Sequence, residues 1–114
     1  AMPPRAKQPL PGPDFAPVFF ALGDKTRLRL IAVLCAGGVF SIAQLTANTQ
    51  ITRQAVTRHL QVLAEAGLVK DLKIGRERLW QFDPLQLEAA RRSLEIIGNQ
   101  WEQALGKLKA TLEK

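Results

Sequence analysis

The sequence predicts a mainly α-helical domain that carries one β-hairpin. Apolar residues recur at helical spacing in several segments, and capping residues or glycines mark many of their ends. A single β-prone stretch, residues 68–83, is divided by Gly75. The chain has 114 residues, 46% of them hydrophobic, which suits one domain with a modest core.

The chain begins with a segment that cannot form a core. Residues 1–13 hold five of the seven prolines and little apolar surface, so we expect a flexible N-terminal arm before a folded domain at 14–114. A first helix is predicted to start at Asp14 as N-cap and to stop at Gly23. Its apolar face should contain Phe15, Val18, Phe19 and Leu22.

Three further helices follow. One is predicted to begin at Asp24, to end at Gly37, and to turn Leu28, Ile31, Ala32 and Cys35 inward. The next begins at Ser41, which has capping-box spacing to Gln44, with Ile42 and Leu45 pointing inward. The fourth is expected to be capped by Thr52 and terminated by Gly67.

The hairpin and a last helix complete the order of elements. Residues 68–83 are predicted to form two strands joined by a basic turn, and Pro84 suits the first turn of a long final helix. A pair of helices a few residues apart is the helix-turn-helix pattern. The order α-α-α-α-β-β-α therefore predicts a winged helix-turn-helix, with the hairpin as wing.

The fourth helix has an unusual polar face. On a helical wheel Val56, Leu60 and Leu63 form the buried stripe, while amide, guanidinium and hydroxyl side chains lie elsewhere. Such groups bind base edges and phosphates, and a recognition helix docks by its N-terminal half. Together with the charges of the hairpin, the predicted DNA-binding residues are Thr52, Arg53, Gln54, Thr57, Arg58, His59, Gln61, Lys73, Arg76 and Arg78.

Simpler interpretations stay open for each of these features. Any solvated helix face is polar, although this one lacks Glu and Lys in its first two turns. His59, at the border of the apolar stripe, suits a packed residue or a phosphate contact better than a catalyst. Charged residues on the hairpin can also protect a strand edge from aggregation.

Composition narrows the function further. The net charge is +6 and the pI about 10.1, as for proteins with polyanionic partners. Residues 84–114 contain five basic and four acidic side chains, a net +1, so the excess lies before them. One Cys and one His provide neither a disulfide nor a zinc cage nor a recognisable catalytic pair, so we expect no enzyme, no cofactor and no metal. Without a membrane span or secretion signal, we expect a cytoplasmic protein.

The last helix predicts a dimer. Leu87, Leu94, Trp101 and Leu108 recur every seven residues, and a helix of about 45 Å is too long for so small a core to cover. Packing of Trp101 on its own domain is the alternative. The predicted dimer interface combines the first and last helices: Phe15, Phe19, Leu94, Ile97, Trp101, Leu105 and Leu108.

Three motifs occur together in order: D-x-T-R-L-R-L from Asp24, T-R-H-L from Thr57 and E-A-G-L-V from Glu65. With them the chain resembles, over about residues 14–84, the ArsR-type family of winged-helix transcriptional repressors. The resemblance implies a homodimer that binds a palindromic operator, often that of its own operon. It implies DNA contacts from Thr52 to Gln54, from Thr57 to His59, and by the wing around Arg76.

The sequence departs from the family pattern where many relatives bind metals. Their third helix carries a Cys-x-Cys pair, but the tripeptide here is Ser41-Ile42-Ala43, and residues 84–114 contain no His for the other familiar site. We therefore expect no metal sensing. Cys35 is interpreted as a packed, inert thiol, with oxidant sensing as the alternative. A regulator responding to a small apolar molecule near Trp101, and a module for protein contacts only, also stay open.

Overall fold

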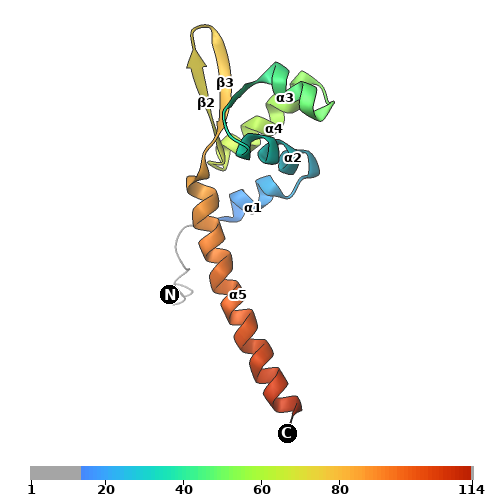
Figure 1. Ribbon diagram of the computed structural model, residues 1–114, viewed down its shortest axis with the longest axis vertical. Coiled ribbons are helices and arrows are strands. Elements are labelled where there is room, and N and C mark those ends of the chain that lie inside the picture. Colours follow the sequence, from blue (N-terminus) through green and yellow to red (C-terminus); the bar gives the residue numbers. More distant parts are fainter. Residues whose placement is uncertain (1–13, 114) are drawn as a thin grey trace, which may run out of the picture.

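A computed structural model describes residues 14–113 (Figure 1). The predicted arm, residues 1–13, lies outside the described residues. The elements are α1 (Ala16–Leu22), α2 (Lys25–Cys35), β1 (Val39–Ser41), α3 (Ile42–Thr49), α4 (Arg53–Glu65), β2 (Val69–Ile74), β3 (Glu77–Phe82) and α5 (Pro84–Leu112). They form a winged helix-turn-helix, as predicted.

Side-chain caps start the helices where the sequence places them, with one exception. Asp24 accepts hydrogen bonds from the backbone amides of Thr26 and Arg27, at 2.9 and 3.0 Å. Ser41 and Gln44 form the reciprocal capping box. The prediction for α1 was wrong by one residue: Phe15 is the N-cap, and Asp14 accepts a hydrogen bond from the amide of Ala16 just before the helix.

The sheet has one strand more than predicted. Its order is β1-β3-β2, and β1 pairs antiparallel with β3, with Phe40 opposite Trp80. The sequence pattern predicts no structure for residues 39–40, because three residues are too few for an alternating pattern. What makes them a strand is the free edge of β3, since backbone groups beside an open edge find hydrogen-bond partners there.

The core lies between the sheet and the first four helices. Leu30, Leu34, Leu45, Leu60 and Leu63 are fully buried. The predicted inner face of α2 was partly wrong. Leu28 is 52% exposed, and Ala32 and Cys35 are exposed as well. Two overlapping stripes of α2 have helical spacing, and packing against α3 and α4 selects the one that contains Leu30, Ile31 and Leu34.

The end of α4 confirms the predicted glycine stop. Gly67 follows the C-cap residue Ala66 and has a φ of +79°, a left-handed conformation that favours glycine. A Cβ at this position would also lie 2.6 Å from Cγ of Gln86 on α5. The glycine therefore serves both the turn into β2 and the approach of α5.

The last helix projects from the domain. It has 29 residues, a length of about 43 Å, and Ala90 is its one buried residue. Figure 1 shows α5 continuing well past α1 and away from the sheet. Every residue from 94 to 113 is exposed. None of the helices in residues 14–113 has the length and apolar character needed to cross a membrane.

Candidate nucleic-acid interface

A tight turn joins α3 to α4. Gln50, the C-cap of α3, has a φ of +60° and lies in the left-handed region, which non-glycine residues seldom adopt. Thr52 then caps α4, its hydroxyl accepting a hydrogen bond from the amide of Ala55 at 3.1 Å. These two residues fix the direction in which α4 leaves the turn.

The outer face of α4 carries the predicted polar side chains. Arg53, Gln54, Arg58 and Gln61 are exposed, and Thr57 is half-buried at their flank. Val56, Leu60 and Leu63 are fully buried on the opposite side. Within residues 14–113 the side chains of the four exposed residues make no hydrogen bond or ion pair. Their donors and acceptors are therefore available to a ligand.

His59 differs from those four residues because its side chain has contacts within the chain. It is half-buried, and its Nδ1 is 3.2 Å from Nη1 of Arg27 on α2. Arg27 is protonated and can only donate, so Nδ1 is the acceptor in this contact. Nδ1 also lies 4.0 Å from a carboxylate oxygen of Asp24. His59 therefore connects α4 to the start of α2.

Arg27 is a functional residue that the sequence pattern does not predict. Its Nε donates to the carbonyl of Ala21 at 2.6 Å and its Nη2 to that of Phe20 at 3.3 Å, so it also binds the end of α1. Its guanidinium lies 5.4 Å from the centre of the Phe20 ring. The D-x-T-R motif was the available signal, but motif spacing gave no sign of a contact with a residue 32 positions away.

Asp24 contributes a fixed negative charge to this cluster. The backbone amide of Arg27, which donates to its carboxylate, lowers the pKa of Asp24 below its ordinary value, and the Arg27 charge acts in the same direction. Asp24 therefore stays ionised while it caps α2. Three elements, α1, α2 and α4, meet at this point.

The basic residues of the wing have different roles in the structure. Lys73 and Arg76 are exposed at the end of the hairpin, where Gly75 has a φ of +64°. Arg78 instead donates from Nε to Asp71 at 2.9 Å, and its guanidinium lies 4.8 Å from the centre of the buried Trp80 ring. Among the described residues Lys73 and Arg76 have no ion-pair partner, so they can meet a ligand. Arg78 instead joins β3 to β2 through its ion pair with Asp71.

The predicted interface residues on the terminal helices are largely uncovered. Trp101 is 64% exposed, so it does not pack on its own domain. Phe15 is half-buried. The other five are exposed to between 40% and 57%: Phe19, Leu94, Ile97, Leu105 and Leu108.

Cys35 does not have the environment predicted for it. The thiol is exposed at the end of α2 rather than packed in the core. Partial burial nevertheless raises the pKa of Cys35 above its ordinary value, which favours the protonated, less reactive form. Residues 14–113 contain no cluster of three or more His, Cys, Asp or Glu side chains that could hold a metal ion.

Comparison with known proteins places this arrangement in a family. A family model described as a helix-turn-helix domain matches residues 22–71. The HTH-type transcriptional regulator Rv2034 of Mycobacterium tuberculosis is 39% identical over 85 residues, 75% of this chain and 76% of that protein. A solved ArsR-like transcriptional regulator from Rhodococcus is 35% identical and superimposes with a TM-score of 0.77, over 87% of this chain and 90% of that one.

The chain belongs to the ArsR family of transcriptional regulators. The arsenical resistance operon repressor of Escherichia coli is a more distant relative, 29% identical over 74% of this chain and 69% of its own length. The resemblance inferred from the three motifs is thereby confirmed. Members of the family are DNA-binding regulators rather than enzymes, so the polar face of α4 belongs to a regulator of transcription.

Proposed function

We propose that this regulator represses transcription in the cytoplasm as a homodimer bound to a palindromic operator, and that it does so without a metal. In this proposal Thr52, Arg53, Gln54, Thr57, Arg58, His59 and Gln61 contact DNA from α4. Lys73, Arg76 and Arg78 support them from the wing.

The main support for the proposal is the polar face of α4, whose exposed side chains make no hydrogen bond or ion pair within residues 14–113. Arg53, Gln54 and Arg58 occupy the first two turns, where a recognition helix meets base edges. Guanidinium groups suit guanine and phosphate, and amides suit adenine. An ordinary surface helix of a +6 chain would be expected to pair some of these charges, and α5 does so through Arg91 with Glu88 and Glu95.

Two subunits are needed for useful affinity. One α4 helix reads only a few base pairs, and a dimer reads two half-sites about one turn of DNA, roughly 34 Å, apart. The apolar side chains exposed on α5 supply a surface for the second copy. A solved possible ArsR-family regulator of Mycobacterium bovis, 18% identical, is described as a homodimeric winged helix-turn-helix DNA-binding domain.

The proposal without metal rests on ligand chemistry. Ser41 and Ala43 stand where many relatives have thiolates, and neither side chain can replace one. Adding zinc or arsenite should therefore leave operator occupancy unchanged. Release of the operator by either would show that a site forms in the dimer.

The decisive experiment compares two arginines. Arg58→Ala should raise the Kd for the DNA upstream of the regulator's own gene by about 5- to 150-fold, or 1–3 kcal/mol. Arg92→Ala, an equally charged change on the outer side of α5, is the matched control and should change the Kd little. Equal losses, or none, would contradict the assignment of α4 as the reading helix.

The salt response provides a second test. If the dimer neutralises 6–10 phosphates, affinity should fall about 10³- to 10⁵-fold between 50 and 200 mM salt. A flat response would contradict direct phosphate contacts and favour a module for protein contacts only.

A further inference from the structure

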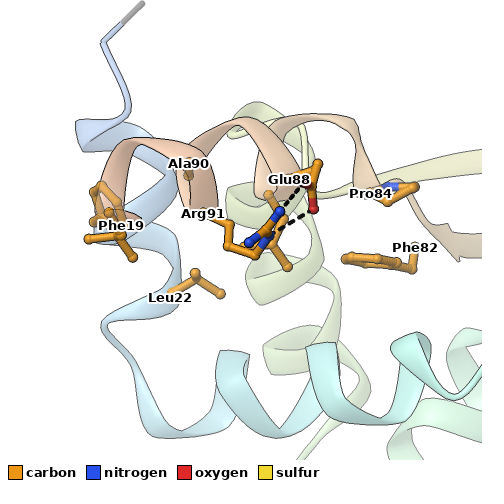
Figure 2. A pocket seen from close by; sticks show the side chains of 9 residues that line it. Phe19, Leu22, Phe82, Pro84, Glu88, Ala90 and Arg91 are labelled. Carbon is orange, nitrogen blue, oxygen red and sulfur yellow. Dashed lines mark hydrogen bonds and ion pairs between the residues drawn. The ribbon is translucent and has the colours of Figure 1, made fainter. Parts of the chain in front are cut away.

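An apolar hollow lies where α1, the end of β3 and the first turns of α5 meet. Its volume is about 400 Å³. Figure 2 shows Phe19 and Leu22 of α1 at one end, Phe82 and Pro84 at the other, and Arg91 between them. The small side chain of Ala90 forms part of the wall. An apolar hollow of this size is a preferred binding surface for an apolar group.

We propose that the hollow is the receptor for Trp101 of a second copy of this chain. The inference rests on the proposed homodimer and adds the way in which the two α5 helices pair: antiparallel, about a two-fold axis midway between Leu94 and Ile97. Each dimer then contains the contact twice, because a two-fold interface repeats every pair.

The heptad pattern of α5 supports this register. Leu87, Leu94, Trp101 and Leu108 recur every seven residues, and a second row, Ala90, Ile97, Ala104 and Thr111, lies beside it. With the axis midway between Leu94 and Ile97, Leu94 faces the partner's Ile97 and Leu87 faces the partner's Ala104. The partner's Trp101 then lies level with Ala90, which is 1% exposed and forms the base of the hollow. At two of these three contacts, Leu87 with the partner's Ala104 and the partner's Trp101 with Ala90, a large side chain therefore meets a small one.

Other pairings leave the hollow open. A parallel pair sets Trp101 against the partner's Trp101, far from Ala90. An antiparallel pair shifted by one heptad toward the C-terminus brings the partner's Leu108 to Ala90 and moves the indole away. The chosen register also places the partner's Leu108 near Asp83, so all four residues of the first row are covered.

Arg91 explains why the occupant should be aromatic. Its guanidinium is held by Glu88, 2.6 Å away, and by Glu95, so it forms a fixed, flat surface beside the apolar wall. An indole that stacks on such a surface gains a cation–π attraction, which an aliphatic side chain cannot provide. Trp101 is the one exposed tryptophan of the described chain, since Trp80 is 2% exposed.

The first test measures dimer dissociation by sedimentation equilibrium. Trp101→Ala should raise the dimer Kd by about 30-fold or more, as for a central aromatic anchor, and Trp101→Phe by much less. Ile96→Ala is the matched control, because Ile96 is 53% exposed but lies outside both rows. Trp101 is exposed in the single chain, so these variants should keep the fold. An unchanged Kd for Trp101→Ala would overturn the proposal.

The second test determines the register of the two α5 helices by disulfide cross-linking. Pairs of cysteines are introduced into a Cys35→Ser variant and oxidised. Leu87→Cys with Ala104→Cys should yield covalent dimers, whereas Leu108→Cys alone should not, since the two copies of residue 108 would be about 37 Å apart. A cross-link through Leu108→Cys, or none through the first pair while the dimer persists, overturns this inference and leaves the proposed function standing. A wild-type chain that is monomeric while bound to operator overturns both.

Discussion

The guanidinium of Arg27 lies 3.2 Å from Nδ1 of His59 and joins the end of α1 to the middle of α4. The same side chain binds the carbonyls of Phe20 and Ala21. In the proposed dimer, α1 faces the partner and α4 faces DNA. The two helices are thus linked through one planar guanidinium group, and we expect a shift of one helix to affect the other.

We expect Arg27→Met to weaken both the fold and DNA binding. It removes three hydrogen bonds of a half-buried group and should lower the free energy of unfolding by about 1–2 kcal/mol. Operator affinity should fall as well, although Arg27 touches no DNA in the proposal. Thermal unfolding and binding titrations measure the two effects. Arg29→Met, an exposed position on the same helix, is the control, and equal losses there would contradict this role.

We expect the wing arginines to separate into two classes. Arg76→Ala should weaken DNA binding and reduce the salt slope by about one, with no change in melting temperature. Arg78→Ala removes the ion pair with Asp71 and the stacking on Trp80, so it should lower stability by up to about 1 kcal/mol, a modest amount because the pair is half exposed. Melting curves and salt titrations of both variants test this. A loss of stability for Arg76→Ala, with none for Arg78→Ala, would contradict the prediction.

Replacing Gln50, the residue with left-handed backbone between α3 and α4, should stabilise the protein. Gln50→Gly removes the steric cost at a φ of +60°, and we expect a gain of about 0.5–1 kcal/mol in the free energy of unfolding. Gln100→Gly, in the exposed middle of α5, should instead lose about 1 kcal/mol of helix stability. Denaturant unfolding compares them. A loss at both positions would show that the turn does not strain Gln50.

The cap of α2 should make stability depend on acid. The pKa of Asp24 is lower in the folded chain than its ordinary value of 3.8, because the Arg27 amide donates to the carboxylate. Its contribution is therefore complete above about pH 3.8 and is lost as the pH falls through the folded value. Asp24→Asn retains a capping side chain but cannot titrate. Melting temperatures from pH 2 to 7 should thus fall less steeply for this variant, and parallel curves would contradict the prediction.

Cys35 should be accessible but slow to react. Its thiol is exposed, and its raised pKa keeps it protonated at neutral pH. A disulfide reagent should modify one thiol per chain in the native state, at a rate below that of free cysteine. The Cys35→Ser variant, which has no thiol, is the control and should not react. Faster modification, accompanied by release of DNA, would support the redox-responsive alternative instead.

Local interactions explain how far the sequence determined this structure. The caps at Asp24, Ser41 and Thr52, the stop at Gly67 and the hairpin depend on neighbours within a few residues, and each was predicted from the sequence. The apolar stripe of α4 was predicted as well. Val56, Leu60 and Leu63 are spaced by four and three residues, so they can lie on only one side of the helix. The family followed from three motifs in order.

Tertiary structure alone decided the features that depend on distant partners. Strand β1 exists because β3 offers an edge, and the buried face of α2 was chosen by α3 and α4 from two stripes of equal spacing. Arg27 contacts His59, and Arg78 contacts Asp71 and Trp80, because the fold places these side chains next to one another. Hydrogen bonds and ring contacts act only over a few ångströms. Contacts between residues that are distant in the sequence therefore cannot be predicted from the sequence pattern, because they depend on where the folded backbone places both groups.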